Sequence, residues 1–378
     1  MVVGRWVKTV LWVSFVFLFT FLILGCGREK GKNAYELGKG YFLASEYTQA
    51  MIQLEEWVQK KKNPNLLESY AMLAVIYHDK ENRKVEYERV INILKGYGEE
   101  GMAAVLKLIE NPTTASRLQE NIDGILVAGG SSSVGPLVAA LKHPNWRLKV
   151  HAHDVLIKVG QPAIKGLITA VNDPEPYTES MAIDALSRIS DKDAEPLIQQ
   201  KIHDPNNLVK VSAAIALYTM GKTDSRDIII NGLKDPNVDV RRIAVKAMAE
   251  VLNDPPADKM IELLKDPDPE VRNYAAIANG KTKNQGAVAM LVKEMKDDKD
   301  EQVRSSAGQA LESIGKPSVE PLNSLLNNAN DMELVIRVAQ ILGNIGDKSS
   351  VNSLESAYKR AKNDMMKNEI AKALNKID

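Results

Sequence analysis

The chain has 378 residues with 49 basic and 49 acidic side chains, so its formal net charge is zero. Without an excess of Lys and Arg there is little to neutralise phosphates, which excludes nucleic acid as an expected partner. One cysteine leaves no disulfide framework and no cysteine-ligated metal, and 5% aromatic residues are fewer than a compact α/β enzyme core normally uses.

The first 25 residues have the pattern of an export signal. Arg5 and Lys8 give a basic head without an acid, and residues 9–24 are almost entirely apolar. Gly25 and Cys26 follow, and the sequence then turns polar at once. A basic head, an apolar stretch and a small residue before a cut site are typical of a secretory signal peptide.

The cysteine makes this signal more specific. Ile23, Leu24, Gly25 and Cys26 resemble the lipobox of bacterial lipoproteins. The resemblance implies that residues 1–25 are removed, that Cys26 is acylated, and that residues 26–33 form a tether. Each buried CH2 of an acyl chain contributes about 0.8 kcal/mol, so several chains hold a protein firmly to a bilayer. The alternatives are an uncleaved transmembrane anchor and an ordinary signal peptide.

These features place the protein in the bacterial cell envelope, with a lipid anchor as its membrane contact. Gly27 follows the cysteine, whereas aspartate there often marks retention in the inner membrane. In a bacterium with two membranes, we therefore expect the outer membrane.

Residues 34–98 resemble tetratricopeptide repeats. Small and aromatic residues recur with that spacing at Ala34, Leu37, Gly38, Tyr41, Ala50 and Leu54. The first-helix part returns 36 residues later at Tyr70, Leu73, Ala74 and Tyr77, against a period of about 34. Trp57 and Glu86 depart from the small residues of that family. Two helix pairs are too few to stand alone, so we expect them to pack on the pair that follows.

Residues 99–378 are organised by a repeat. Asp-Pro occurs at 31-residue intervals, at residues 173, 204, 235 and 266. A fixed period of this length predicts a solenoid. The spacing predicts nine helix pairs, with turns between the two helices of each pair near residues 111, 143, 173, 204, 235, 266, 297, 328 and 363.

One repeat, residues 226–256, shows the physical basis of the prediction. Pro236 ends a first helix, because proline lacks an N–H and disfavours helix in the residue before it. Asn237 or Asp239 can cap the second helix. In that helix the apolar residues form one stripe of a 3.6-residue helix, at Val240, Ile243, Ala244, Ala247, Met248 and Val251. The alanines let neighbouring helices approach closely.

An Asp-Pro turn, Val-Arg five residues after the Asp, and an Ala-rich helix resemble a HEAT repeat, and more closely the phycobilisome-lyase type. The resemblance implies an all-α, right-handed α-solenoid. It also implies a structural ladder of side chains that hydrogen-bond between successive repeats. The ladder residues are Asp204, Asp235, Arg241, Asp266, Arg272, Asp297 and Arg304.

Several short patterns resemble nucleotide or metal sites, and we interpret them as structural features. Gly221-Lys222-Thr223 and Gly280-Lys281-Thr282 look like the end of a phosphate-binding loop, but Ala216 and Ala275 stand where that loop needs glycine. We interpret both glycines as helix stops, like Gly160, Gly315 and Gly346. His151 and His153 lie on different sides of a helix and are poorly placed to share a metal. We expect no catalytic residue, metal, nucleotide or other cofactor.

The function that follows is a membrane-anchored scaffold that binds a protein or peptide partner on a curved solenoid surface. By family resemblance, the second helices of the pairs are expected to line its concave side. Two alternatives remain: an enzyme of the HEAT-like lyase or hydroxylase type, and an assembly factor for an envelope complex.

Overall fold

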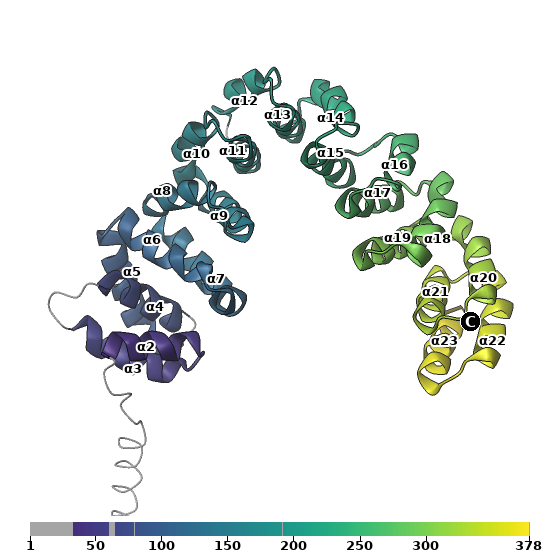
Figure 1. Cartoon of the computed structure of the whole chain (residues 1–378), viewed down its shortest axis with the longest axis horizontal. Coiled ribbons are helices and arrows are strands. Elements are labelled where there is room, and N and C mark those ends of the chain that lie inside the picture. The colour runs from purple at the N-terminus through teal and green to yellow at the C-terminus, as the bar shows by residue number, and fades with distance from the viewer. Residues whose placement is uncertain (1–32, 60–64, 79, 191, 378) are drawn as a thin grey trace, which may run out of the picture. The chain divides into compact units, whose positions relative to one another are not determined.

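A computed structural model of the chain describes residues 33–59, 65–78, 80–190 and 192–377 (Figure 1). The regular structure there is helical throughout, with 22 α-helices, short 3-10 turns and no strand. The predicted all-α solenoid is therefore confirmed. The lipobox residues, Ile23, Leu24, Gly25 and Cys26, lie outside the described residues.

The chain divides into two compact units. Unit 1 ends at Gly166, and unit 2 begins at Leu167. This division lies within a helix, α10 (Ile164–Ala170), and differs from the predicted domain boundary between residues 98 and 99. The latter boundary stays a prediction about repeat type.

Unit 1 is built from helix pairs. Its helices are α2 (Ala34–Leu43), α3 (Tyr47–Val58), α4 (Leu66–Tyr77), α5 (Lys84–Gly96), α6 (Glu99–Lys107), α7 (Pro112–Gly129), α8 (Ser131–Ala140) and α9 (Trp146–Val159). Short 3-10 turns follow at Glu81–Arg83, Leu108–Glu110 and Gln161–Ala163.

The first pair closes around a small residue, as its spacing predicts. A Cβ atom on Gly38 of α2 would lie 2.8 Å from Cγ of Leu54 on α3, so only glycine allows this approach. Trp57 replaces a small residue of the tetratricopeptide pattern, and its ring lies 6.2 Å from that of Tyr35. Helices α4 and α5 pack on α6, and Asn121 of α7 donates to the carbonyl oxygen of Val75 at 3.2 Å.

Unit 2 continues the pairs. Its helices are α11 (Pro176–Ile189), α12 (Glu195–Lys201), α13 (Asn207–Thr219), α14 (Arg226–Gly232), α15 (Val238–Glu250), α16 (Ala257–Leu263), α17 (Pro269–Lys281), α18 (Val288–Asp297), α19 (Glu301–Ile314), α20 (Val319–Asn328), α21 (Met332–Ile345), α22 (Val351–Arg360) and α23 (Asp364–Ile377). The even-numbered first helices form one layer, and the odd-numbered second helices form the inner one (Figure 1). The turns within pairs fall at the residues that the period predicts.

Local chemistry sets the start of each second helix. In α15 the N-cap is Asn237, whose side chain accepts from the backbone N–H of Asp239 at 2.9 Å. The cap is thus Asn237 rather than Asp239. Val240, Ala244 and Met248 are fully or almost fully buried, so this part of the predicted stripe packs against the neighbouring helices. Ile243 and Val251, at the edge of the predicted stripe, are only half-buried.

Small residues bring successive second helices together. A Cβ atom on Gly280 of α17 would lie 2.7 Å from Cα of Ala310 on α19. The interpretation of Gly280 as a helix stop is therefore wrong, because α17 continues through it to Lys281. Gly280 instead allows α17 to pack closely against α19. The residue with positive φ at this end of the helix is Lys283. Gly160, Gly221, Gly315 and Gly346 have the positive φ expected of stops.

Candidate binding site

An ion-pair ladder connects the turns of unit 2. The guanidinium of Arg241 donates from Nη1 to the carbonyl oxygen of Asp235 in its own turn, at 2.9 Å. Its other two nitrogens donate to the carboxylate of Asp266 in the next turn, at 2.9 and 3.0 Å. Arg272 repeats this geometry, with 2.9 Å to the carbonyl oxygen of Asp266 and 2.7 and 2.9 Å to the carboxylate of Asp298. These bidentate contacts hold each turn to the next.

The carboxylate that receives Arg272 is Asp298, and the prediction of Asp297 is wrong by one residue. Asp297 is the last residue of α18, and its side chain is 54% exposed beside Lys296. The Asp298 side chain is 3% exposed and also accepts from the backbone N–H of Asp300 at 2.8 Å. The 31-residue period points to Asp297, but the five-residue spacing from Asp to Val303 points to Asp298.

Each ion pair between successive turns is one rung of the ladder, and the ladder has two rungs among the described residues, Arg241–Asp266 and Arg272–Asp298. It ends on both sides of them. Arg304 donates to the carbonyl oxygen of Asp298 at 2.8 Å, and its ion pair is with Glu301 on its own helix. Asp235 receives the side-chain amide of Asn207 at 2.7 Å instead of an arginine. Asp204 accepts the backbone N–H of Asn206 at 2.8 Å and serves its own turn. Of the predicted ladder residues, Arg241 and Arg272 thus join successive turns by ion pairs, whereas Arg304 and Asp204 contact residues of their own repeat.

A second carboxyl group adjoins the ladder. Burial, and then the neighbouring Asp298, raise the pKa of Glu294 to about 7. Burial raises the pKa of Asp298 as well, but hydrogen bonds with Arg272 and Glu294 outweigh it and bring that pKa down to about 2. Of the two carboxyl groups, Glu294 therefore holds its proton to the higher pH, and Asp298 is the carboxylate opposite Arg272.

The second helices of unit 2 carry half-buried apolar side chains at helical positions that point away from their most deeply buried residues. They are Tyr177, Ile215, Ile243, Tyr274 and Ile277, from α11, α13, α15 and α17. We call this set the inner-face stripe. The Nζ atom of Lys246 lies 5.8 Å from the ring centre of Tyr274, so a cation covers part of the stripe.

A polar network borders the stripe. The hydroxyl of Tyr177 donates to the carboxylate of Asp239, which connects α11 to α15 past the intervening α13. Arg242 donates to Asp239 at 3.1 Å and to Asp268 at 2.6 and 3.0 Å. Burial and the bond to Asp239 raise the pKa of Tyr177 to about 12, so its phenol remains a donor. These residues fix the positions of side chains along the stripe.

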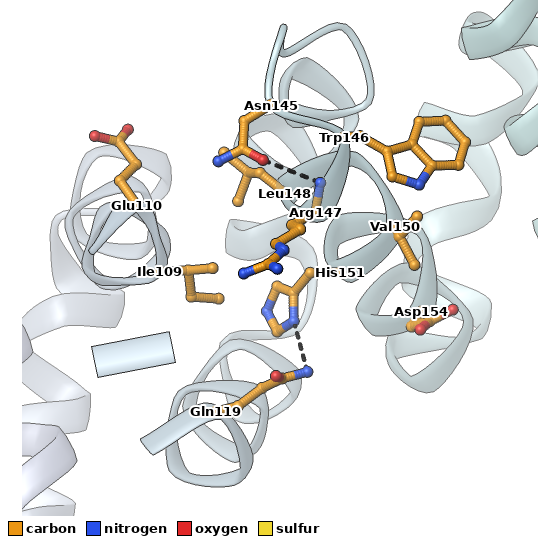
Figure 2. Close-up of a pocket in the computed structure, with 10 residues that line it drawn as sticks. All are labelled: Ile109, Glu110, Gln119, Asn145, Trp146, Arg147, Leu148, Val150, His151 and Asp154. Atoms are coloured by element: carbon orange, nitrogen blue, oxygen red, sulfur yellow. Dashed lines mark hydrogen bonds between the residues drawn. The ribbon is translucent and has the colours of Figure 1, made fainter. Parts of the chain in front are cut away.

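Unit 1 contains a cavity of about 420 Å³ lined by the turn before α7, by α7 and by the start of α9 (Figure 2). Arg147 directs its guanidinium into this cavity, between Ile109 and His151 (Figure 2). Trp146, 57% exposed, lies at its rim. Arg147 is not predictable from the sequence as a cavity residue, because a single arginine at a helix start carries no local signal.

His151 forms the floor of the cavity. Its side chain is 5% exposed, and its Nδ1 lies 3.3 Å from the amide nitrogen of Gln119. Its Nε2 lies 3.2 Å from a carboxylate oxygen of Asp123, and Lys158 donates to the other oxygen at 2.7 Å. Burial lowers the pKa of His151, although Asp123 acts in the opposite direction, so the ring is neutral at neutral pH. His153 contacts Asp154 instead, so the two histidines serve different neighbours.

Within the described residues, no group of three or more His, Cys, Asp or Glu side chains is arranged to hold a metal. The same part of the chain includes no helix with the length and apolar character that crossing a membrane requires.

The family follows from the repeats. A sequence profile described as HEAT repeats matches residues 164–249, 227–312 and 290–375, which together exceed half of the chain. The protein therefore belongs to the HEAT-repeat family. No curated protein matches the chain.

Several solved structures are similar to this chain at low identity. The Escherichia coli protein YibA is 22% identical, with a TM-score of 0.47 over 67% of this chain and 95% of its own. Human deoxyhypusine hydroxylase, in complex with glycerol, is 18% identical, with a TM-score of 0.30 over 75% and 97%. The CpcE–CpcF phycocyanin lyase of Nostoc sp. PCC7120 is 18% identical, with a TM-score of 0.23 over 47% and 98%.

Proposed function

We propose that this protein is a scaffold of the bacterial cell envelope that binds a protein or peptide partner along the inner-face stripe of unit 2. The observation that carries the proposal is the stripe itself. Four successive second helices contribute half-buried apolar side chains to it, from Tyr177 to Ile277. Stacked repeats turn such side chains into an extended surface, which suits a partner that lies across several repeats.

The borders of the stripe support the same function. Tyr177, Asp239 and Arg242 are held by hydrogen bonds that run from α11 to α17. A surface whose side chains are already fixed loses little conformational entropy when a partner binds. Apolar contacts in the middle and satisfied polar groups at the edge are the usual anatomy of a protein interface.

Site-specific photo-crosslinking in intact cells tests the proposal. A photoreactive residue in place of Ile277 should yield a defined adduct, and Ile243→Asp should abolish it. The matched control is Ile228, which is also half-buried but lies on the first helix α14. Equal adducts from both positions, or none from Ile277, would contradict binding on the inner face.

The lipid anchor is a separate part of the proposal and rests on the sequence of residues 23–26. Mass spectrometry of the N-terminal peptide should find acyl chains on Cys26, and Cys26→Ala should release the protein from membranes. An unmodified thiol on a protein free in the cytosol would rule out the anchor without affecting the inner-face stripe.

The two remaining functions are separable by experiment. An enzyme of the lyase or hydroxylase type should purify with a bound bilin or with stoichiometric iron, and either result would overturn a purely binding role. An assembly factor should crosslink through Ile277 to immature subunits of an envelope complex, whereas a static scaffold should crosslink to mature ones.

A further inference from the structure

The cavity of unit 1 contains a cation that the fold does not use. The side chain of Arg147 is exposed, and within the described part of the chain no carboxylate forms an ion pair with it. Arg188, which is also exposed, shows the contrast: its Nε lies 2.8 Å from the carboxylate of Asp184 on the same helix. A guanidinium offers five donors in a planar fork that matches a carboxylate.

A second donor adjoins the first. The side-chain oxygen of Asn145 accepts from the backbone N–H of Arg147 at 3.0 Å, which fixes the orientation of the amide. Its nitrogen is consequently directed to the cavity side (Figure 2). The backbone N–H of Asn145 donates to Nδ1 of His143 at 3.1 Å and holds the segment in place. Donors from two residues at the start of α9, Asn145 and Arg147, thus border one cavity.

The residues that line the cavity restrict the polarity and charge of a ligand that could bind there. Ile109, Leu148 and Val150 are apolar, and the neutral His151 ring closes the floor with its nitrogens directed at Gln119 and Asp123. Two carboxylates also line the cavity. That of Glu110 points away from Arg147 (Figure 2), and that of Asp154 contacts His153 at 3.1 Å. Their negative charge opposes a doubly charged anion more than a singly charged one.

We propose that this cavity binds a singly charged carboxylate carried on an apolar chain, with Arg147 and Asn145 as its donors. Such a group is either the C-terminal carboxylate of a peptide or an acidic side chain within one. The site lies in unit 1, uses none of the inner-face stripe of unit 2, and does not depend on a partner binding there.

Calorimetric titration of the full-length chain tests this site. The probes are N-acetyl-Leu-Leu with a free carboxylate, the amide of the same peptide, and N-acetyl-Leu-Glu-Leu amide. At least one carboxylate peptide should bind about tenfold more tightly than the neutral amide, as expected for a charge-assisted hydrogen bond. The first peptide reports a C-terminal group, and the third reports a side chain. Inorganic phosphate should bind more weakly than the carboxylate peptide that binds most tightly.

Variants separate the site from non-specific attraction. Arg147→Gln should weaken the carboxylate peptide about tenfold, and Arg147→Lys should recover part of the loss because the charge remains without the planar fork. Arg188→Gln, the matched control, should bind as the wild type does, and circular dichroism should show equal helicity in all three variants. The proposal is overturned if neither carboxylate peptide exceeds the amide, if Arg147→Gln binds like the wild type, or if phosphate binds most tightly.

Discussion

Units 1 and 2 connect their helices by different kinds of polar contact. In unit 1 the hydroxyl of Tyr77 donates to Glu55 at 2.5 Å, and Lys158 donates to Asp123 at 2.7 Å. Each of these contacts uses its own pair of residue types. In unit 2, Arg272 repeats toward Asp298 the geometry that Arg241 makes toward Asp266.

The difference shows what a regular repeat makes possible. A contact that recurs from turn to turn distributes stability over nearest neighbours, and each rung depends on the same two residue types. The polar contacts of unit 1 do not recur from repeat to repeat, so each depends on its own pair of residues. Unit 1 can therefore contain a cavity with Arg147, which has no ion pair among the described residues, whereas in unit 2 arginines of the second helices pair with neighbouring carboxylates.

The largest expected effect comes from breaking a rung of the ladder. Asp298→Ala removes the carboxylate that receives Arg272, whose side chain is 15% exposed. Because a half-buried guanidinium is left without its partner, the free energy of unfolding should fall by about 3 kcal/mol. Urea denaturation measures it. The adjacent Asp297→Ala should cost less than about 0.5 kcal/mol, since that side chain is exposed. Equal losses of unfolding free energy in the two variants would show that Asp297 contributes to the ladder as much as Asp298.

The next effect is a pH dependence in unit 2. The folded pKa of Glu294, about 7, lies above its ordinary value of 4.5. The unfolded chain therefore holds this proton less tightly, and stability present below pH 4.5 is lost as the pH rises through 7.

Glu294→Gln, which stays neutral, should remove this loss and exceed the wild type by about 1–2 kcal/mol at pH 8. Unfolding curves from pH 5 to 8 measure the difference, with the exposed Glu320→Gln of α20 as the control. A wild type whose stability is constant over that window would contradict the shifted pKa of Glu294.

A smaller effect is expected from one of the individual contacts of unit 1. Tyr77→Phe deletes the hydroxyl that donates to Glu55, at a cost of about 1 kcal/mol. Hydrogen exchange should report faster opening of α4 and leave unit 2 unchanged. Tyr97→Phe, at a tyrosine that is 46% exposed, should change neither unit. Faster exchange in both units would show that they do not open independently.

The smallest effect is a pH dependence of opposite sign in unit 1. Burial lowers the pKa of His151 below 6.5, so the unfolded chain binds this proton first as the pH falls. Stability of unit 1 should therefore decline below pH 6.5, while the Glu294 contribution of unit 2 grows over the same range. Hydrogen exchange at pH 5 and 7, resolved by unit, measures both signs, and His151→Gln should remove only the first. If the His151→Gln variant still loses the same stability of unit 1 at low pH, another titrating group is responsible for that loss.

The sequence predicted the helical pairs because their signals are local. Asn237 caps α15 through a contact two residues away, and Val240, Ala244 and Met248 share one face by their spacing alone. The prediction failed at Asp297, where a period counted along the chain competed with the spacing to Val303. It failed again at Gly280, whose role depends on Ala310 of another helix.

The sequence by itself thus determined the repeat, most of the helix ends and most of the buried faces, since each depends on residues within one or two turns. Only the tertiary structure decided which carboxylate receives Arg272, that Tyr177 contacts Asp239, and that Arg147 faces a cavity without an ion pair among the described residues. Those outcomes depend on distances between residues on different helices, and a spacing along the chain does not contain them.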